Sequence, residues 1–482
     1  MTYETVIGIE THVELATASK MFCGCKVDFG APPNTTICPV CLGLPGAMPV
    51  PNETAIEWIV KIGLALDCDI APHSLFHRKN YFYPDLPKNY QISQYDLPIC
   101  IDGTLDVTAE GETTAIGITR VHMEEDTGKS LHVGEGGRIH GADHSLIDFN
   151  RSGVPLVEVV SEPDIRSAAQ ARAYATELQS LIRSLGVSDA KLEEGSMRFD
   201  ANVSLRPRGA KELGTRTETK NMNSLRSLEQ ALAYEVERQT EVLVSGGSVT
   251  QETRHWNEQD GMTHSMRGKE ESSDYRYFPE PDLVPLAVDE TWREEVRSTL
   301  PELPRARLER LLKSGIDQAP ARQLAADTGL SELFSSAVAA GGEARNVANW
   351  LTGEVVAHLK REEVSVEEIA LEADHLRELS EMTARGDLSS TAAKEVLAGV
   401  MAGEGSPSQV AESRDLIQVT DVGALDVEVD AVLAANSDAV AKIREGDSKP
   451  IGFLVGQVMQ ATGGKADPKV VGDLIATKAK GG

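Results

Sequence analysis

Short runs in which apolar and polar residues alternate characterise the first 290 or so positions of the chain. Two of them, at residues 5–9 and 155–160, follow the period of two that is typical of strands with one buried face. Helical spacing predicts two helices in the same part, over 167–185 and 224–243, and the second is closed by a glycine pair. Strands mixed with a few helices over nearly 300 residues indicate a large α+β domain.

From about residue 290 the pattern changes to the period of amphipathic helices. Prolines and glycine pairs separate the predicted helices, which cover 292–300, 304–313, 319–328, 343–360 and 391–401. Residues 402–408, AGEGSPS, resemble a linker, and short helices follow them. A length of 482 residues corresponds to about three domains. We therefore predict a large mixed α/β cradle domain at 1–293, an all-helical domain at 294–405 and a small helical tail domain at 406–482.

The amino-acid composition and net charge exclude some classes of protein but do not indicate a specific function. Hydrophobic residues make up 41% of the chain, which is enough for a buried core and excludes intrinsic disorder. The 47 basic and 75 acidic residues give a net charge of −28, which argues against a broad nucleic-acid surface. The N-terminal residues resemble no signal peptide, and no apolar run is long enough to span a membrane, so we expect a cytoplasmic protein with no membrane contact.

Four of the six cysteines form two pairs, Cys23-Gly-Cys25 and Cys38-Pro-Val-Cys41, with 12 residues between them. Two pairs on tight turns can present four thiolates to one tetrahedral ion, so the spacing predicts a structural zinc site. Such a site leaves no open position for water and performs no chemistry. Buried free thiols and a redox C-x-x-C motif are the alternatives. The remaining two, Cys68 and Cys100, lie among apolar neighbours and are predicted to be core residues.

Two other motifs resemble known sites without completing them. His12-Val-Glu14 followed by Cys38-x-x-Cys41 resembles the zinc deaminase signature, but Ile37 stands where that signature has proline, and Cys23 and Cys25 would have no role. Gly128-Lys-Ser resembles the end of a phosphate-binding P-loop, but Met123 occupies the position of its first glycine. We therefore expect that any ATP is bound without a P-loop.

A second group of candidate ligands consists of carboxylates and one histidine. Glu10, His12 and Glu14 alternate along the first expected strand and so share one of its faces. Glu125 belongs to an acidic run, 124–126, that follows an expected strand at 116–121, and Glu158 lies in an otherwise apolar strand, where a carboxylate needs a partner or a metal. Carboxylate oxygens with one imidazole suit Mg²⁺ or Mn²⁺. The alternative is a set of satisfied salt bridges. The candidate ligands are Glu10, His12, Glu125 and Glu158.

Residues 76–95 carry six of the 22 aromatic residues of the chain, interleaved with cations. Rings beside cations form stacking platforms for bases and sugars. Lys79 and Tyr81 lie in the middle of this segment and are the candidate binding residues. An aromatic-packed loop core is an equally good interpretation.

Several longer motifs together resemble one family, the B subunits of the aspartyl/glutamyl-tRNA amidotransferases. The resemblance runs in order through the whole chain, and its six motifs are GIETHVEL at 8–15, RKNYFYPD at 78–85, HMEED at 122–126, NRSGVP at 150–155, RYFPEPD at 276–282 and GFLVGQVM at 452–459. It implies a cytoplasmic heterotrimer in which the other two components are a glutaminase, the A partner, and a C partner. The B component would phosphorylate the side-chain carboxylate of mischarged Glu-tRNA(Gln) or Asp-tRNA(Asn) with ATP and Mg²⁺, and ammonia from the glutaminase would then form the amide.

The resemblance also assigns roles to the candidate residues. His12, Glu125 and Glu158 resemble the Mg²⁺ ligands of the family, with Glu10 as a fourth, and Lys79 and Tyr81 would hold ATP or the charged 3′ end. The zinc would be structural. The tail would reach the tRNA body, and residues 441–482 indeed carry seven basic against four acidic side chains. A scaffold that binds tRNA while a partner protein performs all the catalysis remains the alternative.

Overall fold

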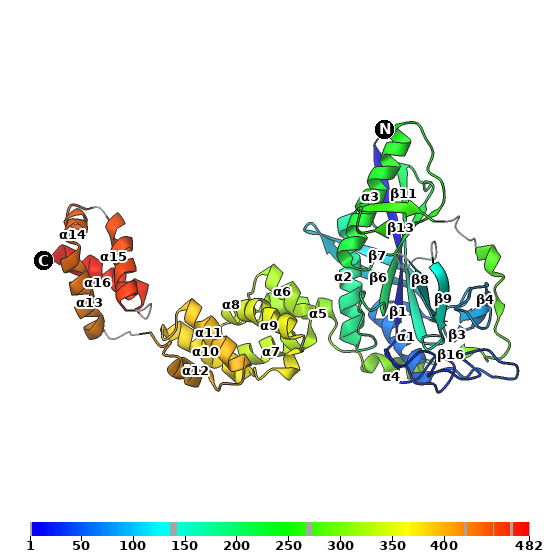
Figure 1. The fold of residues 1–482 in the computed structure, drawn as a ribbon, viewed down its shortest axis with the longest axis horizontal. Coiled ribbons are helices and arrows are strands. Elements are labelled where there is room, and N and C mark those ends of the chain that lie inside the picture. The colour runs from blue at the N-terminus through cyan, green and yellow to red at the C-terminus, as the bar shows by residue number, and fades with distance from the viewer. Residues whose placement is uncertain are drawn as a thin grey trace. The chain divides into compact units, whose positions relative to one another are not determined.

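The computed structural model describes residues 2–134, 142–266, 272–418, 422–446, 448–462 and 466–481. The chain divides into two compact units, Met1–Pro304 and Arg305–Gly482. Every strand of the described residues lies in the first unit, and the described part of the second is helical (Figure 1). The predicted α+β class is therefore confirmed.

A nine-stranded sheet forms the centre of the first unit, in the order β14-β13-β12-β11-β1-β10-β7-β6-β2. Its strand pairs are antiparallel except β12 with β13. The strands of this sheet are β1 (Tyr3–Glu14), β2 (Asp69–Ile70), β6 (Cys100–Ala109), β7 (Glu112–Glu125), β10 (Pro155–Ser161), β11 (Met197–Pro207), β12 (Thr217–Lys220), β13 (Thr253–Asn257) and β14 (Met262–Ser265).

Three small sheets complete the β structure. They are β15 (Phe278–Pro279) with β4 (His77–Asn80) and β5 (Tyr90–Ser93), β16 (Leu286–Ala287) with β3 (His73–Ser74), and β8 (Lys129–Gly134) with β9 (Ala142–Asp148). A strand and not a helix follows Gly128, so the rejection of a P-loop agrees with the structure.

The helices of the first unit are α1 (Glu53–Ala65), α2 (Ala168–Leu185), α3 (Leu225–Val244), the 3₁₀ turn η1 (Ser272–Tyr275) and α4 (Glu290–Ser298). Helices α1 and α2 contact β6, α3 contacts β11, and α4 contacts α1, whereas η1 contacts β4 and the small sheet that contains β4 packs on β7 through β5. From Ile7 to the end of β1 the burial alternates, so that Ile7, Ile9 and Val13 belong to the core while the even-numbered residues between them are more exposed. Cys68 and Cys100 are buried, as predicted.

Local capping explains where the helices begin and end. Ser167 accepts a hydrogen bond from the Gln170 amide at the start of α2, and Gly186 adopts the left-handed conformation at its end. Helix α1 was not predicted from the sequence, although Asn52 caps it in the same way. The strand predicted at 116–121 is too short, because β7 continues to Glu125.

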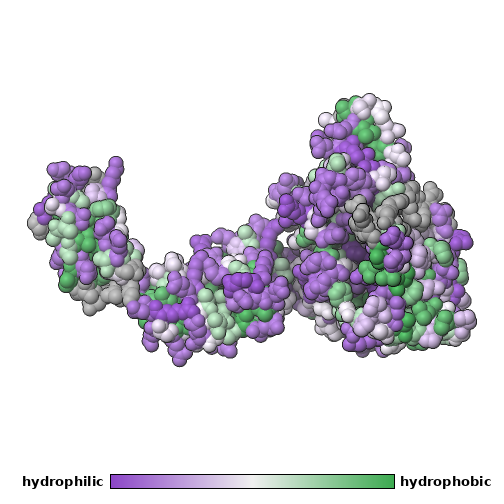
Figure 2. Space-filling model, in the orientation of Figure 1, coloured by the Kyte–Doolittle hydropathy of each residue, from purple (hydrophilic) through white to green (hydrophobic). Residues whose placement is uncertain are grey.

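Two separate hydrophobic cores organise the second unit. Its helices are α5 (Pro304–Lys313), α6 (Gln318–Ala325), α7 (Thr328–Ala339), α8 (Ala344–Trp350), the π-helical turn η2 (Leu351–Val355), α9 (Val356–Glu362), the 3₁₀ turn η3 (Val366–Glu368), α10 (Ala373–Arg385), α11 (Ser390–Met401), α12 (Pro407–Ser413), α13 (Val422–Ala435), α14 (Ser437–Arg444), α15 (Lys449–Ala461) and α16 (Pro468–Gly481). Figure 2 shows hydrophilic side chains over much of the visible face of these helices.

The predicted linker at 402–408 is too long, because α12 begins at Pro407. Val410 and Ala411 are buried in the core formed mainly by residues 311–401, and the Gln418 amide donates to the Asp387 carbonyl. The domain limits stay a prediction, and we propose to move the second one from 405 to just after 418. Among the described residues no helix is long and apolar enough to cross a membrane.

Candidate metal centres and the adjoining pocket

The strand register brings polar side chains into a row on one face of the large sheet. His12 of β1 lies opposite Glu158 of β10 on one side and Arg198 of β11 on the other. Glu158 in turn lies opposite His122 of β7. Because directly opposite residues in a sheet point to the same face, polar side chains of four neighbouring strands follow one another across one face of the sheet.

Glu124 completes this group, and Glu125 does not. One potential ligand atom each of His12, Glu124 and Glu158 lies within 4.8 Å of the others. Ser93 Oγ and Gln91 Nε2 donate to the Glu124 carboxylate at 2.7 and 3.0 Å.

Glu125 points to other partners. Its carboxylate accepts a hydrogen bond from the Ile92 amide at 2.9 Å and pairs with Lys88. Because β7 includes both glutamates, they fall on alternate sides of the strand. The structure therefore brings Glu124 to His12 and Glu158, where the sequence-based prediction names Glu125.

Buried charges stabilise one another within the group. Burial alone would lower the pKa of His122, but the carboxylates of Glu158 and Glu124, 3.2 and 3.4 Å away, raise it to about 9. Burial would raise the pKa of Glu124, but Lys79 and His122 lower it to about 2. The pKa of Glu158 is held well below its usual value by His122 and His12 despite its burial. Both carboxylates are therefore ionised at neutral pH.

A polar pocket of about 640 Å³ opens beside this group. Among its lining residues, His12, Glu124 and Asp126 contribute the acidic and imidazole side, while Lys79 and Arg198 supply positive charge. Arg198 donates to Asp126 at 2.9 Å. The pocket thus combines hard ligands for a cation with cations that can attract an anion.

Glu10 and Glu14 share the face of His12 but belong to different surroundings. Asn202 Nδ2 donates to the Glu10 carboxylate at 3.1 Å, and Glu10 lines a neighbouring pocket of about 200 Å³. Burial and the nearby Asp126 raise the pKa of Glu14 to about 8. Neither carboxylate joins the group that can hold a metal.

Lys79 and Tyr81, both predicted as binding residues, line the pocket. Lys79 Nζ lies 3.7 Å from the Glu124 carboxylate and 5.0 Å from the centre of the Tyr275 ring. The Tyr81 hydroxyl donates to Gln91 Oε1 at 3.2 Å, and its ring meets Tyr275 edge to face.

Sequence reasoning did not single out His122, Gln91 or Tyr275. For His122 a signal was available, because alternation along the strand places it on the same side of β7 as Glu124. Gln91 reaches the site from β5 and Tyr275 from η1, so the positions of these two depend on the tertiary fold.

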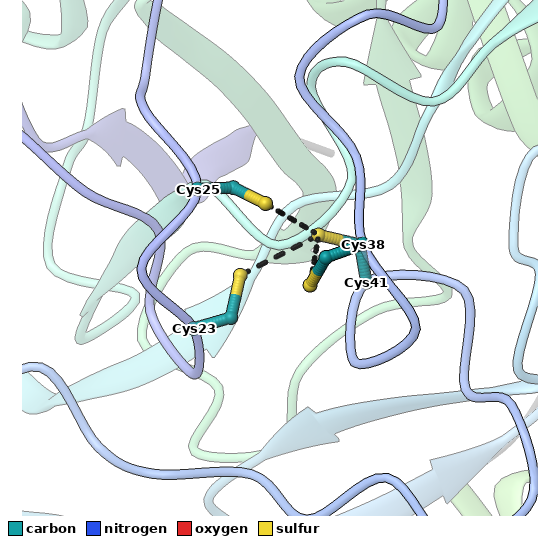
Figure 3. Close-up of side chains that lie close together, drawn as sticks. All are labelled: Cys23, Cys25, Cys38 and Cys41. Atoms are coloured by element: carbon teal, nitrogen blue, oxygen red, sulfur yellow. Dashed lines mark hydrogen bonds between the residues drawn. The ribbon is translucent and has the colours of Figure 1, made fainter.

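The four predicted cysteines lie together at the second candidate centre (Figure 3). Cys41 Sγ is 3.4, 3.6 and 3.7 Å from the sulfur atoms of Cys23, Cys38 and Cys25. A zinc ion about 2.3 Å from four tetrahedral sulfurs requires S···S separations of about 3.8 Å, so the arrangement fits that ion. The hydrogen bond from Cys23, helped by the charge of Lys20, lowers the pKa of Cys41 to about 4.

The separation of the two centres excludes the deaminase interpretation. A deaminase would place a histidine beside Cys38 and Cys41 on one zinc ion. His12 instead groups with two glutamates, and the cysteines group with one another. The four cysteines can bind a metal, but no open position remains for a reacting water.

Comparisons with known proteins agree with this arrangement. Residues 5–294 match a model described as the GatB/GatE catalytic domain, and residues 332–478 match a model described as the GatB domain. The chain belongs to the GatB/GatE family. Both centres fall within the first of these matches. The predicted resemblance to amidotransferase B subunits is thereby confirmed.

Relatives that match this chain over nearly its full length share one name. A protein of Frankia casuarinae, named as the B subunit of an aspartyl/glutamyl-tRNA(Asn/Gln) amidotransferase, is 52% identical over 98% of this chain and 95% of its own length. A protein of Moorella thermoacetica with the same name is 51% identical over 98% of this chain and 99% of its own length. A protein of Streptomyces coelicolor with the same name is 50% identical over 99% of this chain and 96% of its own length.

Proposed function

We propose that the protein is the component of a tRNA-dependent amidotransferase that activates the misacylated amino acid. Its substrates would be Glu-tRNA(Gln) or Asp-tRNA(Asn) and ATP, and its products the corresponding amidated tRNAs. The observation that carries the proposal is the group of His12, Glu124 and Glu158, which opens onto a pocket that also contains Lys79 and Arg198. Family membership adds the expectation of the glutaminase A partner and the C partner in the cytoplasm.

The chemistry explains why such a mixed pocket is needed. In the first step a side-chain carboxylate oxygen attacks the γ-phosphorus of ATP, the bond to the β-phosphate oxygen breaks, and ADP leaves. In the second step ammonia attacks the acyl carbon, phosphate leaves with the C–O bonding electrons, and the nitrogen loses a proton. Two anions must first meet in line, which costs electrostatic energy unless positive charge lies between them.

The residues of this chain fit a divalent cation at that point. The ionised carboxylates of Glu124 and Glu158 offer hard oxygen ligands, and His12 offers one imidazole nitrogen. Mg²⁺ bound there would screen the two anions and the charge that develops during transfer. Lys79, with a fifth of its side chain exposed, is positioned to contact the carboxylate or a phosphate oxygen.

Two of the sequence-derived assignments change in this proposal. Glu124 replaces Glu125 as a metal ligand, and Glu10 is assigned to the neighbouring pocket. Tyr81 keeps its role as a wall of the site for ATP or the charged 3′ end. The four cysteines would hold a structural Zn²⁺, with no part in the reaction.

The proposal is tested by co-expressing the chain with its A and C partners. The complex is incubated with ATP, glutamine and each mischarged tRNA, and amide formation is measured on the recovered amino acid. We expect ATP-dependent amide with at least one tRNA and none with the His12→Ala variant. If that variant still phosphorylates the carboxylate, catalysis lies in a partner and the scaffold alternative is correct.

The tail supplies a second, separate expectation. Truncation after Gln418 removes the core formed by α13 to α16 but leaves the other core of the second unit intact. Because residues 441–482 carry an excess of basic side chains, we expect the truncated complex to bind tRNA at least about tenfold more weakly, with a smaller salt dependence. Glutaminase activity should change little. Equal tRNA affinity with and without the tail would contradict a tRNA-binding role.

A further inference from the structure

Lys20 is a fully buried lysine beside the cysteine centre. Its side chain is 0% exposed, and its Nζ lies 3.6 Å from Cys41 Sγ and 3.4 Å from the Phe149 carbonyl oxygen. The structure records no ion pair between Lys20 and a carboxylate of the described residues. A buried ammonium group is costly unless an anion offsets its charge. The cysteine sulfurs are the anionic partner that its surroundings provide.

A metal bound by four cysteines needs a positive charge nearby. Four thiolates around one Zn²⁺ leave a net charge of about −2, which must be buried in part because Cys41 is buried. Groups outside the ligand set that donate hydrogen bonds to the ligands tune the affinity of such sites. We propose that Lys20 is this charge-compensating residue, an inference that rests on the metal site proposed above.

The same lysine also connects the cysteine loop, residues 20–41, to the turn at 149–153. Besides the Lys20 contact with Phe149, the Met21 amide donates to the Gly153 carbonyl at 2.7 Å. Asn34 makes two further contacts. Its side-chain oxygen accepts a hydrogen bond from the Phe149 backbone amide at 2.8 Å, and its backbone amide donates to the Asp148 carboxylate at 3.0 Å. The turn is thus held to the cysteine loop at several points.

On its other side the turn contacts the polar pocket. The Gly153 amide donates to the Asp126 carbonyl at 2.9 Å, and the Asp126 amide donates to the Val154 carbonyl at 2.8 Å. Arg151, at the centre of the turn, lies 3.6 Å from the Asp126 carboxylate and donates to the Gly128 carbonyl at 2.9 Å. Asp126 lines the pocket. Lys20 is therefore a positioning residue that ties the metal-bearing loop to one wall of the candidate active site.

Zinc affinity is the direct test. Zinc content and its dissociation constant, from competition with a chromophoric chelator, are measured on the full chain for wild type, Lys20→Met and Lys26→Met. Lys26 is the matched control, since it lies on the same loop with 71% of its side chain exposed and pairs with Asp28. We expect about tenfold weaker binding for Lys20→Met and an unchanged constant for Lys26→Met. Equal affinities for the two variants would overturn the role of Lys20, and a wild-type protein without zinc would overturn the metal site itself.

Hydrogen exchange tests the connection to the pocket. Amides at 149–153 should exchange about tenfold faster in Lys20→Met and after zinc removal, with no change in Lys26→Met. Lys20→Arg keeps the positive charge that Lys20→Met removes, so it should retain most of the wild-type zinc affinity. If Lys20→Met does not fold, the neutral but polar Lys20→Gln replaces it in both measurements. Unchanged exchange at 149–153 in zinc-free protein would contradict the positioning role.

Discussion

The two candidate metal centres of this protein differ in how the chain assembles them. The four cysteines lie within one loop, between positions 23 and 41. The second group draws His12, Glu124 and Glu158 from three strands of the large sheet. The first centre is therefore specified by local spacing, and the second by strand order and register.

The two centres also differ in chemistry and access. Sulfur ligands backed by a buried lysine form a closed site that suits a structural ion. The candidate oxygen and imidazole ligands open onto a pocket of about 640 Å³, so a cation held there would have room for substrate and for water beside it. One centre has the features of a structural support and the other those of a reaction site. Variants that affect only the structural support or only the reaction test this distinction.

The largest expected effect belongs to the open centre. Glu158→Gln removes a buried charge that is a candidate ligand but changes the side-chain volume little. We expect ATP-dependent amide formation in the assembled complex to fall at least about a hundredfold, as it does when an electrostatic contact to the transition state is lost. Zinc content should equal that of wild type. Loss of zinc in this variant would show that the two centres are not independent.

The reciprocal variant, Cys38→Ser, should have a smaller effect on the reaction. It removes one of four sulfurs, so bound zinc should be lost and the thermal unfolding midpoint should fall by several degrees. Amide formation should decrease only a few-fold, in proportion to the loosened turn at 149–153. A loss as large as that of Glu158→Gln would mean that the cysteine centre is more than a structural support.

The ease of predicting each centre from the sequence follows from the same difference. The pairing of Cys23 and Cys25 with Cys38 and Cys41 is visible in the sequence because tight turns bring neighbours together. The common face of Glu10, His12 and Glu14 was also predictable, since alternation along one strand needs no knowledge of its neighbours.

Assignments that depend on strand length or tertiary contacts were not predictable in this way. An expected strand that ended at 121 left Glu124 and Glu125 without assigned faces, and the longer β7 decides which of them meets Glu158. Lys20 gave no signal, because a charged residue is expected at the surface unless buried partners are known. Such partners come from distant strands and loops.

The choice between the two adjacent glutamates is a sharper test of the open centre. Mn²⁺ affinity, measured by electron paramagnetic resonance on the full chain, should fall about tenfold in Glu124→Gln because a charged candidate ligand is lost. In Glu125→Gln it should stay within about twofold, since that carboxylate pairs with Lys88 instead. The reverse order would restore the sequence-based assignment of Glu125.

The smallest expected effect is a pH dependence of stability that arises at His122. Its pKa in the folded protein, about 9, lies above the usual value of 6.5, so the proton contributes stability that is fully present below about pH 6.5 and is lost as the pH rises through 9. We expect the free energy of unfolding of zinc-loaded, magnesium-free protein in urea to fall between pH 7 and pH 9.5, with a slope of at most about 1.4 kcal/mol per pH unit from this one proton. His122→Gln removes the proton and should flatten that slope. Equal slopes for wild type and variant would mean that His122 is neutral in the folded protein, and that Glu124 and Glu158 depend on Lys79 and His12 for their compensation.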